Sequence, residues 1–171
     1  VKRVREQLSS RSGGTSTSRL YCVVTMSTSM QGRSFRIPIM SDYEVAENAI
    51  SALTERFGSE NPLTEPIPPE GTNGFRVQKY GMRTWGDVFT PRQKLALLTY
   101  AELMREYVEQ LPTKDASFKI AVEAVLALLL NRLADLNASL CVWQLNTPNT
   151  AHVFGRWVLP MVFDFGFFMF G

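Results

Sequence analysis

The stretch from residue 74 to residue 95 divides the chain into two parts of different character. Charged segments rich in proline, glycine and serine precede it, and long helical patterns follow it. The stretch ends in a helix start, because Thr90 is a favoured N-cap residue, Pro91 suits the first helical position and Gln93 completes a Thr-x-x-Gln capping box. We therefore expect a helix to begin at Pro91 and to organise the C-terminal part of the chain.

Two helices are predicted after this start. The first extends to about residue 111, because Pro112 cannot continue it. The second covers about 116–138 and is apolar nearly all round from 120 to 130. A short link makes the two helices antiparallel neighbours, which buries one face of the second. Its other faces need further neighbours, either the N-terminal elements or protein outside this chain.

The N-terminal part predicts a β-hairpin. Residues 1–18 are typical of a flexible basic lead-in, rich in serine and glycine. Two runs of β-branched and aromatic residues follow at 20–25 and 34–39, joined by a loose connection. Pro38 has no backbone donor, so the second strand lies at an edge or ends early.

A helix and an irregular connector follow the hairpin. Ser41 and Glu44 form a Ser-x-x-Glu capping box, and Gly58 suits the C-terminal stop. Residues 59–73 contain prolines and glycine at a density that excludes a regular element, so we expect an extended segment laid across a surface.

These elements predict an α+β fold that is mostly α. We expect a single partial domain over 19–171, with the hairpin and helix at 19–58, the connector at 59–89 and the helical region at 90–171. The chain starts with Val and ends in an apolar run, which indicates a part of a longer protein.

Charge is distributed in blocks although the net charge is only +2. Residues 1–36 carry seven cations and one acid, residues 42–70 carry seven acids and one cation, and residues 74–94 carry five cations and one acid. Two basic blocks around an acidic one favour a polyanion-binding surface with a screening segment. The alternative is a solvated surface on which the charges cluster by chance.

Cysteine and histidine usage excludes a zinc site built by this chain alone. Cys22 and Cys141 lie far apart, and His152 is the sole histidine. No signal peptide is visible, and the longest apolar runs, 124–130 and 157–163, are too short to span a bilayer. We expect a cytoplasmic protein with reduced thiols and no membrane partner.

Catalysis by this chain is not predicted. His152 has no visible nucleophile partner and is more often structural, while Asp135 and Asp164 are single carboxylates. Glu123 on the apolar helix fits a packing edge. Residues 71–74 lack the Lys-Ser/Thr and the preceding strand of a phosphate-binding loop.

Binding is better supported, because cations alternate with aromatic residues between 75 and 94. Such cations contact phosphates while rings stack on bases. The alternative is that the aromatic residues form the core of a glycine-rich loop and the cations its solvated rim. The candidate nucleic-acid-binding residues are Arg76, Lys79, Arg83, Arg92 and Lys94, with Arg156 a weaker one.

Three segments, 68–93, 131–143 and 154–166, resemble in that order the bacterial and archaeal family of adenine-specific DNA methylases that contain a zinc ribbon. The phrase Trp85-Gly-Asp-Val-Phe-Thr-Pro-Arg-Gln93 is the most specific part. The hairpin start at 20–24 also fits. Residues 167–171 depart from the family, which continues there with an acidic residue and an Asn-Pro step.

The resemblance implies a DNA adenine methyltransferase that uses S-adenosylmethionine. In that family the cofactor-binding glycine motif and the zinc-ribbon cysteines lie upstream of this region, and the catalytic Asp-Pro-Pro-Tyr motif lies downstream. None of these motifs occurs here. The resemblance therefore assigns no catalytic residue and no metal ligand to this chain.

Two functions remain open. In the first, the chain is a helical, partly DNA-facing segment of such a methylase, with DNA and the remaining methylase domains as partners. In the second, it is a non-catalytic structural or protein-interaction module, which the over-apolar second helix of the C-terminal pair favours. We expect the chain to have poor solubility by itself, because its apolar surfaces lack their covers.

Overall fold

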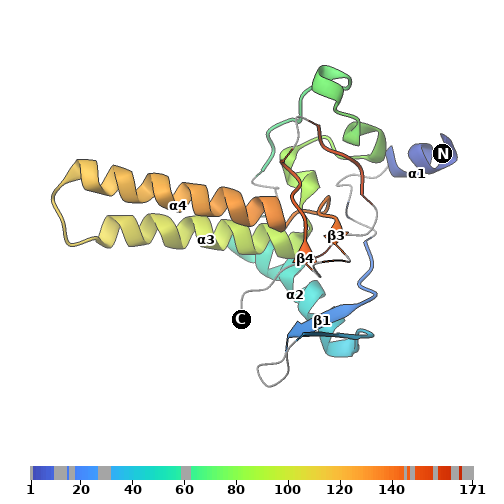
Figure 1. Cartoon of the computed structure of the whole chain (residues 1–171), viewed down its shortest axis with the longest axis horizontal. Coiled ribbons are helices and arrows are strands. Elements are labelled where there is room, and N and C mark those ends of the chain that lie inside the picture. Colours follow the sequence, from blue (N-terminus) through green and yellow to red (C-terminus); the bar gives the residue numbers. More distant parts are fainter. Residues whose placement is uncertain are drawn as a thin grey trace.

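The computed structural model describes residues 2–9, 15, 18–26, 32–58, 63–144, 146, 149–155, 158–162 and 166. The predicted fold class is confirmed, since helices dominate and a two-stranded antiparallel hairpin lies near the N-terminus. Two long helices run side by side and project from the rest of the chain (Figure 1). The other elements gather at the base of this helical hairpin.

The N-terminal hairpin consists of β1 (Val23–Met26) and β2 (Arg33–Arg36). The strands are antiparallel, with Val24 opposite Phe35. The Phe35 ring lies edge-on to Trp143, with ring centroids 6.2 Å apart, and so joins the hairpin to the C-terminal segment.

Helix α2 (Met40–Phe57) begins one residue before the predicted capping box. The predicted cap was wrong, because Ser41 lies inside the helix. The Asp42 carboxylate instead accepts a hydrogen bond from the backbone N–H of Ile39 at 2.8 Å. The predicted stop at Gly58 is confirmed, and its positive φ of 85° is a conformation that glycine adopts without strain.

The helical hairpin consists of α3 (Pro91–Gln110) and α4 (Ala116–Leu136). The predicted capping box is present, since Thr90 N–H donates to the Gln93 side chain (2.9 Å) and Gln93 N–H donates to the Thr90 hydroxyl (3.3 Å). The Asp115 carboxylate caps α4 by accepting from the next helical amides. Both helix starts are therefore encoded locally.

Helix α4 is less covered than its sequence predicts. It packs against α3, but much of its apolar surface faces outward. Among the described residues, no N-terminal element packs extensively against α4, so the first of the two expected sources of further neighbours is not seen there. The exposed apolar residues of α4 include Phe118, Ile120, Val125, Leu128 and Leu129.

Much of the connector folds into turns, and these begin only at the end of 59–73, the segment that we expected to be extended. It contains the 3₁₀ helices η1 (Thr72–Gly74), η2 (Val77–Tyr80) and η3 (Trp85–Val88). Gly71 and Gly81 have φ of 88°, which lets the chain reverse between them. Before these turns, residues 63–67 run antiparallel to 83–86 through backbone hydrogen bonds, so this described part of 59–73 is extended.

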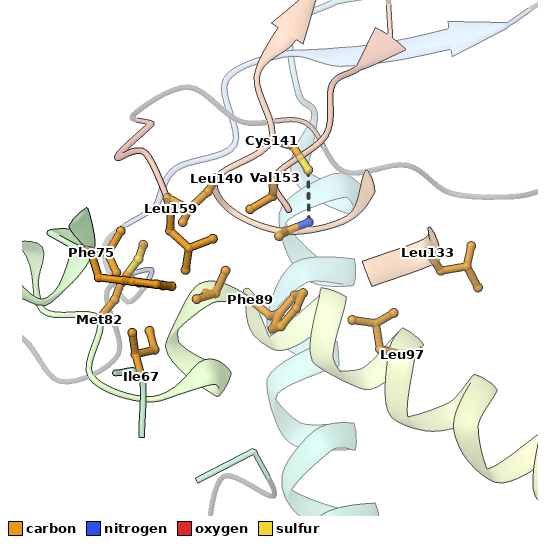
Figure 2. Packing of buried hydrophobic residues seen from close by; sticks show 13 residues of the cluster. Ile67, Phe75, Met82, Phe89, Leu97, Leu133, Leu140, Cys141, Val153 and Leu159 are labelled. Carbon is orange, nitrogen blue, oxygen red and sulfur yellow. Dashed lines mark hydrogen bonds between the residues drawn. The ribbon is translucent and has the colours of Figure 1, made fainter. Parts of the chain in front are cut away.

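The connector also supplies six of the thirteen buried residues of the hydrophobic core, which lies at the base of the helical hairpin (Figure 2). The other seven come from the helices and from the chain after α4. These buried residues are Ile67, Phe75, Val77, Met82, Val88 and Phe89 of the connector, Leu97 and Leu133 of the helices, and Ala138, Leu140, Cys141, Val153 and Leu159 after α4.

Two further elements were not predicted as such. Helix α1 (Lys2–Ser9) lies within the expected flexible lead-in over 1–18 and packs against η2. After α4, β3 (Trp143–Gln144) and β4 (Asn149–Thr150) pair antiparallel, which agrees with the strand alternative for 140–145. The turn predicted over 146–150 lies partly outside the described residues.

Candidate nucleic-acid interface

Two basic segments that are distant in sequence lie together in the structure. The Arg5 guanidinium of α1 lies 5.6 Å from the centre of the Tyr80 ring in η2, and its Nε donates to the Tyr80 hydroxyl at 3.3 Å. The Arg83 guanidinium lies 3.4 Å from the carbonyl oxygen of Ser9, the last residue of α1. A cation at this end of a helix is favourable, because the last carbonyl groups carry partial negative charge.

We call the surface formed by α1 and residues 70–83, which include η1 and η2, the α1–η2 surface. Figure 1 shows α1 and these turns on the side opposite the β-hairpin. Lys2, Arg3 and Arg5 of α1 join the connector cations there, with Glu6 as the acidic residue of the helix. The start of the first charge block and part of the third therefore lie together on one surface.

Three of the predicted cations belong to the α1–η2 surface. Arg76 and Arg83 are exposed. Lys79 is half-buried, and its Nζ lies 2.7 Å from the Glu70 carboxylate. Because Glu70 already neutralises Lys79, the two arginines are the connector cations best placed to meet an anion.

The two remaining described candidates lie elsewhere, on the first turn of α3. Arg92 and Lys94 are half-buried, and burial lowers the pKa of each, offset in part by Asp42 and Asp87 respectively. Both charges are thus partly removed from solvent and lie within the electrostatic influence of acids of α2 and η3. Arg156 lies outside the described residues.

The aromatic residues between these cations mostly pack inward. Phe75 and Phe89 are buried, and Trp85 lies edge-on to Phe75 with centroids 6.3 Å apart. For these rings the core alternative of the sequence is correct. Tyr80 differs, since its ring is half-buried and lies beside Arg5 on the α1–η2 surface.

A second polar cluster forms at the end of α4. Asp135 accepts hydrogen bonds from the amides of Val153 (2.9 Å) and Phe154 (2.8 Å) through one oxygen. Its other oxygen lies 2.5 Å from His152 Nδ1 and 3.2 Å from Arg132. Burial raises the pKa of Asp135, but the bonds from Phe154, His152 and Val153 outweigh it, and the pKa is lowered.

This cluster was missed in the sequence because its two halves are separated by the β3–β4 turn. No spacing signal pairs Asp135 with His152, and both looked isolated. The Asp135 carboxylate accepts hydrogen bonds from backbone amides, so it holds residues 152–154 against α4. His152 Nδ1 also lies 2.6 Å from Arg132, and one nitrogen cannot both donate to Asp135 and accept from Arg132.

Nucleophile and metal chemistry find little support in the described part of the chain. The Cys141 thiol is fully buried, and burial raises its pKa to about 11, so it is not a thiolate at neutral pH. Within the described ranges, no three His, Cys, Asp or Glu side chains are grouped as metal ligands. Over the same residues, no helix has the length and apolar character needed to cross a bilayer.

Comparison of the chain with models of protein families, with curated proteins and with solved structures found no match. The likeness to zinc-ribbon adenine methylases stays a prediction that rests on the three segments quoted above.

Proposed function

We propose that the α1–η2 surface binds the phosphate backbone of DNA. The observation that carries this proposal is the contact of Arg83 with Ser9 and of Arg5 with Tyr80, which joins two basic segments 70 or so residues apart into one surface. Guanidinium groups suit this task, because they stay charged and donate two parallel hydrogen bonds to a phosphate. Backbone contacts of this kind orient a duplex without reading its sequence.

The resemblance extends this proposal to the parent protein, a DNA adenine methyltransferase that uses S-adenosylmethionine. In this proposal the present chain orients DNA, while the remaining domains bind the cofactor and transfer the methyl group. The chain supplies no catalytic residue. We place it in the cytoplasm, where Cys22 and Cys141, both free thiols, stay reduced.

A salt titration of the whole chain with a labelled duplex tests the proposal. Each phosphate contact releases counterions, so the logarithm of the binding constant should fall steeply with the logarithm of salt concentration. Arg76→Ala and Arg83→Ala should each lower the slope by about one. Arg105→Ala is the matched control, because it removes an equal charge from an exposed position of α3.

Two results would contradict the proposal. The first is binding that does not depend on salt, or no binding at low salt. The second is an equal decrease of the salt slope in the Arg105→Ala control, which would mean that binding depends on net charge alone. Lys79→Ala should have a smaller effect than the two arginine variants, since Glu70 neutralises Lys79 in the free chain.

A protein-interaction module is the second candidate, and a separate surface favours it. Leu128 and Val125 of α4 are 68% and 66% exposed, and Leu103 and Tyr107 of α3 are also more than half exposed. Apolar groups gathered on a projecting pair of helices are typical of a protein contact. Binding through this face would change little with salt, which separates it from DNA binding.

A further inference from the structure

A pocket opens in the α1–η2 surface between the connector and the chain after β4. Its volume is about 360 Å³, and it is lined by Arg5, Gly74, Arg76, Tyr80 and residues 158–161. A volume of this order matches sites for small organic ligands. The pocket therefore has room for one planar ring with a charged group attached.

The lining combines two kinds of chemistry. Two arginines, Arg5 and Arg76, are among the lining residues, and the rest of the lining is mostly an apolar wall of Val158, Leu159, Pro160 and Met161. Leu159 is only 3% exposed, so the core fixes this wall in place. Such a pocket suits a ligand with one anionic end and one flat, weakly polar end.

Two contacts hold the pocket in shape without a ligand. The Arg5 Nε donates to the Tyr80 hydroxyl, which orders both side chains before binding. Gly74 lies against the wall so closely that a Cβ there would be 3.1 Å from Val158, and its φ is 81°. Order that exists before binding lowers the entropic cost of binding.

From this geometry, and resting on the proposed DNA binding, we propose that the pocket receives one unpaired nucleotide of the bound strand. Its phosphate lies on Arg5 and Arg76, and its base lies against Tyr80 and the apolar wall. Arginine matches phosphate, and aromatic rings bind bases of any sequence. A base inside a duplex cannot enter, because both its faces are covered by stacking. The α1–η2 surface should thus prefer unpaired DNA.

Binding of three matched DNAs to the whole chain tests the pocket. The DNAs are a short single strand, the same strand with abasic sites that keep every phosphate, and the duplex. We expect the abasic strand to bind about tenfold more weakly than the normal strand, a factor that corresponds to about 1.4 kcal/mol of base stacking. Equal binding of the two strands would overturn the proposal.

Two variants assign the effect to the pocket. Tyr80→Leu keeps an apolar side chain but removes the ring, so the normal and abasic strands should then bind alike. Arg83→Ala removes a charge from the α1–η2 surface but does not line the pocket, so it should weaken both strands equally. A Tyr80→Leu variant that still discriminates the strands contradicts the proposal.

Photo-crosslinking keeps the test independent of folding of the variants. A strand carrying 5-iodouracil should crosslink to Tyr80 or to 158–161 in the unaltered chain, and crosslinks only elsewhere would overturn the pocket. The results distinguish a failure of the pocket proposal from a failure of the proposed DNA binding. A steep salt slope without strand discrimination rejects the pocket alone, whereas salt-independent binding of every DNA rejects both.

Discussion

Ser139 donates two hydrogen bonds to one atom, the carbonyl oxygen of Val88. The hydroxyl contact is 2.6 Å and the amide contact is 2.8 Å. Both residues are almost fully buried, and they are 51 positions apart. This pair joins the last turn of the connector to the chain that leaves α4, so it fixes the base on which the helical hairpin stands.

Replacing Ser139 with alanine should lower the free energy of unfolding by about 1 kcal/mol. The loss is moderate, because the Ser139 amide still donates to Val88 when the hydroxyl is removed. Urea unfolding measures it. Ser51→Ala in the exposed part of α2 is the control and should be neutral or slightly stabilising, since alanine favours helix. Equal effects of both changes would mean that the buried hydroxyl is not important.

Asp135→Asn should destabilise the chain by roughly 1–2 kcal/mol at pH 7, because charged acceptors make the stronger hydrogen bonds. The folded pKa of Asp135 is lowered, so its stabilisation is present above the ordinary carboxyl range and is lost as the pH falls through the lowered value. The difference between the two proteins should therefore shrink in acid.

Unfolding free energies at several pH values check this prediction for Asp135. Glu123→Gln, an exposed change in the same helix, should alter stability by less than about 0.5 kcal/mol at each pH. A difference between the Asp135 variant and the unaltered chain that grows in acid would refute the assignment.

The Asp42 carboxyl should titrate with a pKa of about 2. The Arg36 guanidinium, 2.6 Å away, is the main cause, and the Ile39 amide adds to it. The contribution of Asp42 to stability is present above pH 4 or so and is lost as the pH falls toward 2. Carboxyl NMR shifts measure the titration.

Arg36→Ala should move the pKa of Asp42 back toward its ordinary value of 3.8. Arg33→Ala, a charge removal in the same strand, serves as the control and should move it far less. If both changes had the same effect, the cause would be the general field of the hairpin and not the direct contact.

The two thiols should differ in reactivity. Cys141 is fully buried with a pKa of about 11, whereas Cys22 is half-buried. A thiol reagent at pH 8 should therefore modify Cys22 quickly in the folded chain and Cys141 only after unfolding in urea. In the Cys22→Ser variant, only the slow modification of Cys141 should remain. Rapid modification of Cys141 in the folded Cys22→Ser chain would show that the core opens.

Local signals explain which elements could be predicted. The Thr90–Gln93 box and the prolines that bound α3 act within a few residues, and the structure has them where the sequence predicted. The start of α2 was missed because Ser41 suits an N-cap, whereas Ile39 holds that position and Asp42, the third helical residue, accepts from the Ile39 N–H. Arg36 on the preceding strand pairs with the same carboxylate.

Contacts between charged residues that are distant in sequence could not be predicted either. The cations of 74–94 looked like one surface, yet Arg92 interacts with Asp42 while Arg83 lies at the end of α1. Helix α1 has only Val4 and Leu8 at helical spacing among charged and polar residues, too short a pattern to predict a helix, and it packs beside Tyr80. The position of each charge depends on turns that only glycine conformations and core packing determine.

Of two leucines of α4, one belongs to the core and the other to the exposed apolar face. Leu133 is 8% exposed and Leu128 is 68% exposed. Leu133→Ala should cost about 2–5 kcal/mol, because it leaves a cavity in the core. Leu128→Ala should stay within about 0.5 kcal/mol, since its side chain loses little burial on unfolding. Urea unfolding of dilute protein compares the two. An equally large loss for Leu128→Ala that fades on dilution would mean that a second copy buries this face, which would favour the interaction module over a free helical surface.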